Sequence, residues 1–131
     1  MINRFIYKQL QEEIRQPEIN VLLGPRQVGK TTLLRMLESY GQSRGYKTAF
    51  FDLEQPQVLA GFNVSNHEII EKLRQAGDII FIDEFQYLEN ASKIFKAIYD
   101  SHSKTKLICS GSSSLEIHKH LKESRPSSQN F

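Results

Sequence analysis

Residues Gly24 to Thr31 have the types and spacing of a loop that binds phosphate: a glycine, four residues, and then Gly-Lys-Thr. The loop lies between an apolar run and a stretch with helical apolar spacing. Gly24 and Gly29 let successive backbone N–H groups turn toward phosphate oxygens, and a helix beginning near Lys30 would add the positive end of its dipole. We therefore expect a nucleotide-phosphate site. The alternative, a glycine turn with a surface lysine, does not account for the flanking elements.

Two side chains of this loop have expected chemical roles. The Lys30 ammonium can reach the β- and γ-phosphates, and the Thr31 hydroxyl can ligate Mg²⁺. Lys30 is therefore assigned a catalytic role as well as a binding role. The residues expected to bind the nucleotide are Gly24, Pro25, Arg26, Gln27, Val28, Gly29, Lys30, Thr31 and Thr32.

The acidic pair Asp83 and Glu84 ends the apolar strand expected over residues 78–84. An unbroken apolar run is typical of a strand covered on both faces, as in a parallel sheet, and open α/β sheets bind ligands at the carboxyl ends of their strands. Asp83 can hold Mg²⁺, usually through its waters, and Glu84 can orient and deprotonate the attacking water. Alone, the pair could equally be a polar strand end. Because the pair follows the phosphate-binding loop at Lys30 along the chain, we favour the catalytic role for Asp83 and Glu84.

Other polar residues near strand ends leave alternatives open. A hydroxyl of Ser110 or Ser112 could position the terminal phosphate, or this serine-rich segment could only cap a helix. Gln86 could contact water or phosphate, or be a solvated loop residue. Asp52 and Glu54 are better explained as residues that cap a loop than as part of a metal site.

Apolar runs alternating with amphipathic stretches predict an α/β fold, a three-layer sandwich around a mostly parallel sheet of about four strands. Capping-box spacing at Ser65 and Ser113 marks two helix starts, and Gly41 and Gly45 mark a turn. Strands are expected over residues 19–23, 47–53, 78–84 and 106–110. Helices are expected over residues 3–16, from 30 to about 40, from 66 to 76, from 91 to about 101, and briefly after 113.

Composition limits the class of protein. The 131 residues suit one domain, and a net charge of +2 does not indicate a nucleic-acid partner, although it does not exclude one. The single cysteine, Cys109, lies in an apolar run, which predicts a buried thiol. Because one cysteine cannot form an intramolecular disulfide, a cytoplasmic location is expected. No apolar run approaches the roughly 18 residues that a membrane span needs. The four histidines lack the spacing of a metal site and are expected at the surface.

The segments GPRQVGKTTLL, IIFIDEFQ and LICSGSSSLEI, in this order, resemble bacterial and archaeal ATPases of the AAA superfamily. The resemblance covers residues 1–122. It implies that the loop is the Walker A motif, that Asp83 is the Walker B aspartate and that Glu84 is the adjacent catalytic glutamate. It also implies that Ser110 or Ser112 takes the sensor position, and that the fourth strand lies between the first and the third.

The chain also departs from this family. Its members continue with a fifth core strand on the other side of the first, a helical lid and a C-terminal region. Here the tail has no strand signal, so we expect a core that lacks the fifth strand. Either the chain is a truncated gene product, or another chain supplies the missing parts. The expected organisation is an N-terminal helix packed on the core over residues 1–18, the P-loop ATPase core over 19–122 and a disordered tail over 123–131.

Without a fifth strand, the first strand would be an exposed sheet edge. Arg125 does not qualify as an arginine finger.

The expected function is an Mg²⁺-dependent ATP-binding domain of an AAA-type ATPase that hydrolyses ATP weakly, or only with a partner. ATP is favoured over GTP because no Asn-Lys-x-Asp sequence is present. Besides ATP and ADP, the expected partners are a second copy or a longer homologous chain. One alternative is a non-catalytic ATP-binding fragment with a regulatory or interaction role. A small-molecule kinase is another, although no acceptor pocket or arginine-rich lid is visible in the sequence.

Overall fold

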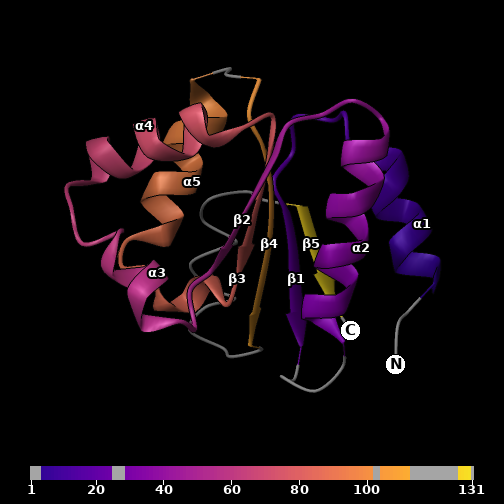
Figure 1. The fold of residues 1–131 in the computed structure, drawn as a ribbon, viewed down its shortest axis with the longest axis horizontal. Coiled ribbons are helices and arrows are strands. Elements are labelled where there is room, and N and C mark those ends of the chain that lie inside the picture. The colour runs from indigo at the N-terminus through magenta and orange to yellow at the C-terminus, as the bar shows by residue number, and fades with distance from the viewer. Residues whose placement is uncertain (1–3, 25–28, 102–103, 113–126, 131) are drawn as a thin grey trace.

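The computed structural model describes residues 4–24, 29–101, 104–112 and 127–130. They form an α/β sandwich in which helices cover both faces of one parallel sheet (Figure 1). The strands are β1 (Asn20–Gly24), β2 (Thr48–Asp52), β3 (Ile79–Asp83), β4 (Lys106–Ser112) and β5 (Ser127–Asn130). The predicted α/β class is therefore confirmed, with β1 to β4 at the expected places.

The strand order is β2-β3-β4-β1-β5, and every neighbouring pair is parallel. The fourth strand lies between the first and the third, as the resemblance implies. Because all strands run the same way, the carboxyl ends of β1, β3 and β4 meet at one edge of the sheet. This edge receives the residues predicted to do chemistry.

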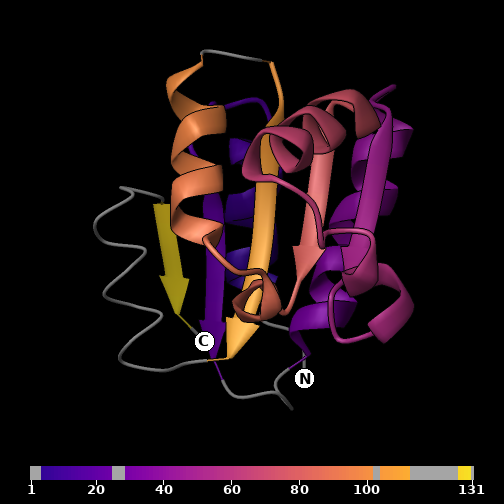
Figure 2. The same cartoon turned by 90° about the vertical axis from the view of Figure 1, so that its left-hand side faces the viewer.

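The short strand β5 corrects the expectation that the fifth strand is missing. It pairs with β1 from Asn20 opposite Ser127 to Leu23 opposite Asn130 (Figure 2). β1 is consequently an inner strand, and residues 127–130 do not belong to a disordered tail. The sequence signal was absent because the four residues of β5 are all polar, so hydrogen bonding between backbones defines this strand without an apolar pattern.

The described residues also form five α-helices and one short 3₁₀-helix. Figure 1 places α1 (Arg4–Glu13) and α2 (Lys30–Ser43) on one face of the sheet, and α3 (Pro56–Ala60), α4 (Asn66–Ala76) and α5 (Ala91–Asp100) on the other. The 3₁₀-helix η1 (Phe85–Tyr87) follows β3. Alternate residues of each strand point to the two faces, so the sheet separates two apolar cores. Ile80 and Ile82 belong to the core under α4 and α5, and Phe81 belongs to the core under α1 and α2.

The predicted helices are present with small differences at their ends. The cap of α4 is as expected, since the Ser65 hydroxyl accepts a hydrogen bond from the Glu68 N–H at 3.2 Å. α2 continues through Gly41, where a turn was expected, and the turn comes at Gly45 with a φ of 90°. A Cβ at Gly41 would lie 3.1 Å from the Ile79 side chain, so this glycine lets α2 pack closely on β3. The helix expected after Ser113 lies outside the described residues.

Two short helices were not predicted. α3 begins with Pro56, and proline fits the first turn of a helix because the N–H that it lacks would have no partner there. η1 has only three residues, which is too short for an apolar period to appear in the sequence. The residues of η1 lie directly beside the predicted site.

Candidate functional site

The phosphate loop, defined here as residues 24–31, begins where β1 ends. Gly24 is paired with Ser112 at the end of β4, and Leu22 is paired with Ser110. The end of β3 is next to β4 on its other side. Three strand ends therefore bring the loop, the acidic pair and the serines together. Pro25, Arg26, Gln27 and Val28 lie outside the described residues, so their roles stay predictions.

Gly29 turns the chain from the loop into α2. It is the N-cap of this helix, with φ 83° and ψ 22°, a left-handed conformation that glycine adopts without steric cost. The helix then starts at Lys30, so its unpaired first-turn N–H groups lie at the sheet edge where the loop passes. Thr31 and Thr32 follow in the first turn, and both are exposed. The first turn therefore offers backbone donors and hydroxyl groups on one surface.

Lys30 is buried, with 2% of its surface exposed. Its Nζ donates to the carbonyl oxygens of Gly24 and Gly111, each at 2.6 Å. The ammonium is therefore held between the end of β1 and the end of β4. Burying a charge is costly unless it is hydrogen-bonded, and these two carbonyls meet that requirement. The positive charge is fixed in place by backbone atoms rather than by a flexible side chain.

Gly111 is a site residue that was not predicted. Besides accepting from Lys30, it packs so closely on η1 that an added Cβ would lie 2.4 Å and 2.8 Å from ring carbons of Phe85. A strand-interior glycine is a signal of close backbone approach, and this one stands inside the serine-rich segment already singled out. Its contact with Lys30 spans 81 residues, so spacing could not have indicated the partner.

The Asp83 carboxylate contacts two hydroxyl side chains of the candidate site. Its Oδ2 accepts from the Thr31 hydroxyl at 2.6 Å, and its Oδ1 accepts from the Ser110 hydroxyl. Asp83 is buried, with 2% of its surface exposed. A carboxylate and a hydroxyl side by side are hard oxygen donors of the kind that Mg²⁺ takes, with phosphate and water as its other ligands. The two predicted metal ligands thus fit a magnesium ion in chemistry and in place.

Glu84 adopts a left-handed backbone conformation, with φ 59° and ψ 53°, which is uncommon for a residue other than glycine. Its N–H donates to the Ser110 hydroxyl at 3.3 Å, and the residue is 6% exposed. Oε1 accepts from Gln86 Nε2 at 2.8 Å and from the Ser112 hydroxyl at 3.3 Å. The structure thus joins Glu84 to both predicted sensor serines.

Gln86 forms hydrogen bonds with Glu84 and Ser112, so it is not only a solvated loop residue. Its Oε1 accepts from the backbone N–H of Ser112 at 3.3 Å, while its Nε2 donates to Glu84. Asp52, in contrast, caps its own loop, accepting from the Glu54 N–H at 3.1 Å and from Gln55 at 3.2 Å. The loop-capping interpretation of Asp52 is confirmed.

The cysteine and the histidine of the described residues take no part in these contacts. Cys109 is buried in β4, and burial raises the pKa of its thiol well above the ordinary range, which agrees with an inert thiol. His67 is exposed, and the other histidines lie outside the described residues. In the described part of the chain, no three His, Cys, Asp or Glu side chains form a metal-binding group.

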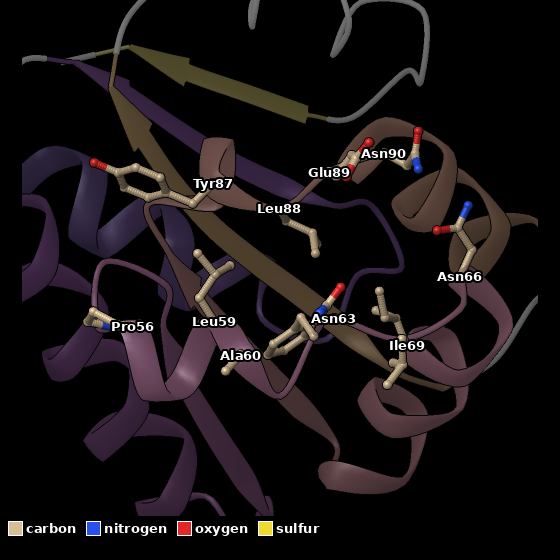
Figure 3. Close-up of a pocket in the computed structure, with 12 residues that line it drawn as sticks. Pro56, Leu59, Ala60, Asn63, Asn66, Ile69, Tyr87, Leu88, Glu89 and Asn90 are labelled. Carbon is tan, nitrogen blue, oxygen red and sulfur yellow. The ribbon is translucent and has the colours of Figure 1, made fainter.

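A cavity of about 400 Å³ lies beside the site, between α3, the start of α4 and the segment from η1 to α5. Figure 3 shows Leu59, Asn63, Tyr87 and Leu88 among the residues that line it. None of the predicted site residues contributes to its wall. The cavity is therefore distinct from the group around Lys30, although Tyr87 of η1 lines it.

A sequence model described as an AAA domain matches residues 16–128. The chain belongs to this AAA domain family. The match includes the phosphate loop and the strand ends that hold Asp83 and Ser110, so the AAA domain contains every described contact of the candidate site. A search of curated proteins found no match.

Solved structures show that the fold of this AAA domain is shared with replication initiators. A DNA replication initiation factor matches 100% of this chain with a TM-score of 0.66 and 15% identity, and AMPPCP-bound DnaA from Aquifex aeolicus matches 97% with the same TM-score and identity. Domain III of the Thermotoga maritima replication initiation protein DnaA matches 98%, with a TM-score of 0.62 and 20% identity. The matches to this chain cover 47%, 44% and 62% of these structures' own chains, respectively.

The helices of the described residues are short. None of them is long and apolar enough to cross a lipid bilayer.

Proposed function

We propose that this AAA domain binds ATP with Mg²⁺ and hydrolyses it, weakly or only with a partner chain. The observation that carries the proposal is the position of Lys30, a buried ammonium held between two strand ends and next to the Thr31–Asp83 pair. The similar DnaA structure described as AMPPCP-bound supports a nucleotide as the ligand.

In this proposal the phosphate loop is a Walker A motif and residues 79–84 are a Walker B motif. Backbone N–H groups of the loop and of the first turn of α2 bind the phosphates, and Lys30 neutralises charge on the β- and γ-phosphates. Thr31 and Asp83 would hold Mg²⁺, which when bound would offset negative charge on the phosphates. The two residues are already joined, so little rearrangement is needed.

Glu84 is proposed as the general base. It would take a proton from a water molecule as the water oxygen attacks the γ-phosphorus and the bond to the β-phosphate oxygen breaks, which yields ADP and phosphate. Ser112 donates to Glu84 and lies at the end of β4. In this proposal its hydroxyl also contacts the terminal phosphate. Ser110 instead supports the backbone of Glu84 and the carboxylate of Asp83.

The test separates binding from turnover. Lys30→Ala should weaken ATP binding by about tenfold to a hundredfold, since a hydrogen bond to a charged group contributes about 1.5–3 kcal/mol. Glu84→Gln should leave the ATP Kd nearly unchanged and lower turnover by about 10²- to 10⁴-fold. Calorimetry and phosphate release measure the two quantities. Lys96→Ala, an exposed lysine of α5, is the matched control.

The result also decides between the proposal and its alternatives. Unchanged ATP binding in Lys30→Ala would contradict the site, and surviving turnover in Glu84→Gln would contradict the base. ATP binding without any turnover would support a non-catalytic regulatory fragment. Phosphate transfer to an added metabolite in preference to water would support a kinase.

Association with a second copy or a longer homologous chain stays a prediction. The exposed edge of β1 that suggested it is covered by β5, so this edge does not support association in the structure. Light scattering of the purified chain measures the oligomeric state directly.

A further inference from the structure

Gln86 links the ends of two neighbouring strands through a single amide group. Its Nε2 donates to Glu84 Oε1 at 2.8 Å, at the end of β3, and its Oε1 accepts from the Ser112 N–H at 3.3 Å, at the end of β4. The Ser112 hydroxyl closes the triangle with a 3.3 Å contact to Glu84 Oε1. Each of the three residues therefore contacts both of the others.

The backbone around Gln86 fixes the position of this amide. The left-handed conformation of Glu84 turns the chain sharply into η1, so the side chain two residues later returns to the Glu84 carboxylate. Phe85, between them, is buried and lies against the backbone of Gly111. Because Phe85 anchors η1 to β4, Gln86 is carried on a packed element.

The contacts also orient the carboxylate. In the described part of the chain, both hydrogen bonds to the Glu84 side chain go to Oε1. Two donors on one oxygen hold the plane of the carboxylate and direct Oε2 away from them. A base must lie within hydrogen-bond reach of the proton that it takes, and a misplacement of about 1 Å can cost on the order of 10²-fold in rate.

We propose that Gln86 is a positioning residue for ATP hydrolysis, which holds Glu84 Oε1 so that Oε2 faces the attacking water. The inference rests on the proposed function, in which Glu84 is the base. Gln86 touches neither the phosphates nor the water in this scheme and acts only through Glu84 and Ser112. When the Ser112 hydroxyl turns to the terminal phosphate, the Gln86 amide keeps the carboxylate in place.

The experiment is the substitution Gln86→Leu, which keeps much of the side-chain volume and removes both amide contacts. We expect kcat to fall about tenfold to a hundredfold, in line with the cost of misplacing a reacting group, while the ATP Kd changes less than twofold. Gln75→Leu makes the same chemical change at an exposed position of α4 and should alter neither quantity. Phosphate release and calorimetry on the whole chain give the two values.

A double-mutant cycle with Ser112→Ala tests the connection itself. If the three residues act as one group, Gln86→Leu should cost much less in the Ser112→Ala background than in the wild type. Full additivity would overturn the coupling to Ser112. In the Glu84→Gln background, Gln86→Leu should have no further effect on kcat.

The outcomes distinguish this inference from the proposed function. A wild-type protein without turnover would overturn the proposed hydrolysis and this inference with it. Wild-type turnover that Gln86→Leu leaves unchanged would overturn this inference alone. A Gln86→Leu protein that loses ATP binding and turnover together would show a structural role instead, and would also overturn it.

Discussion

At the scale of single residues, the site consists of polar groups that satisfy one another. The Lys30 ammonium is bound by two carbonyls, Asp83 is bound by the hydroxyls of Thr31 and Ser110, and Glu84 is bound by Gln86. Buried charged groups need such partners, and the partners also fix where each charge lies. The geometry that the proposed chemistry needs is therefore built by the protein itself.

Gly111 gives a prediction at this scale. Gly111→Ala would place a methyl group within 2.4 Å of a Phe85 ring carbon, which is a steric clash. We therefore expect a loss of about 1–3 kcal/mol in the free energy of unfolding. We also expect weaker ATP binding, because the Gly111 carbonyl that holds Lys30 must shift. Urea unfolding and calorimetry measure the two effects.

Gly61→Ala is the matched control for Gly111→Ala. A Cβ at Gly61 would approach the end of the flexible Lys72 side chain at 2.8 Å, and the residue has an ordinary helical φ of −68°. The control should change stability little. Equal stability and equal ATP affinity in both variants would contradict the role given to Gly111.

At the scale of elements, the two ends of β4 have opposite environments. Its carboxyl end carries Ser110 and Ser112 into the site, whereas its first residue, Lys106, is buried at the other edge of the sheet. Burial lowers the pKa of the Lys106 ammonium to about 8, with the nearby charges of Glu13 and Glu18 opposing the shift. The amine donates to the carbonyl of Glu18.

This lysine gives a prediction for pH dependence. The unfolded chain binds the Lys106 proton more tightly than the folded chain, so the free energy of unfolding should rise as the pH increases from about 8 to about 10.5. The contribution is roughly 3 kcal/mol, at 1.36 kcal/mol per pKa unit. Lys106→Met should be more stable at pH 7 and should lack this part of the rise.

Urea unfolding of wild type and Lys106→Met at several pH values between 7 and 10.5 gives the comparison. The difference between the two proteins isolates Lys106 from the tyrosines and the other lysines. ATP binding should be unchanged, because Lys106 lies at the edge opposite the site. Parallel pH curves for the two proteins would contradict the prediction.

At the scale of the whole molecule, one sheet separates two apolar cores and is extended beyond β1 by β5. The backbone of β5 occupies hydrogen-bonding groups of β1 that would otherwise form an exposed edge. Exposed edges are templates for pairing with another chain. β5 is therefore expected to keep the domain from associating through β1.

A proline pair tests this role. Successive residues of a strand direct their N–H groups to opposite sides, so in the double variant Ser128→Pro/Gln129→Pro one missing donor must face β1. We expect a loss of about 1 kcal/mol or more in stability and association that grows with protein concentration. Urea unfolding and light scattering measure these effects.

The control for the proline pair is Ser128→Ala/Gln129→Ala, which changes the same side chains and keeps both backbone donors. It should resemble the wild type in stability and in mass. If the proline variant also keeps the mass and the stability of the wild type, β5 does not have the role described.

Local patterns in the chain were enough to predict much of this protein. The spacing of Gly24, Gly29 and Lys30, the apolar strand before Asp83 and the cap at Ser65 each depend on residues close together in sequence. Apolar periodicity reports burial, so it located β1 to β4 and the longer helices. The AAA resemblance supplied the position of the fourth strand between the first and the third, which the structure confirms.

Only the tertiary structure decided which groups hold the charges in place. The carbonyl that fixes Lys30 belongs to Gly111, 81 residues away, and the amide of Gln86 reaches Ser112 across 26 residues. β5 likewise depends on its alignment with β1, because polar residues carry no apolar signal. Such contacts follow from how strands are placed side by side, and no pattern of neighbouring residues encodes that placement.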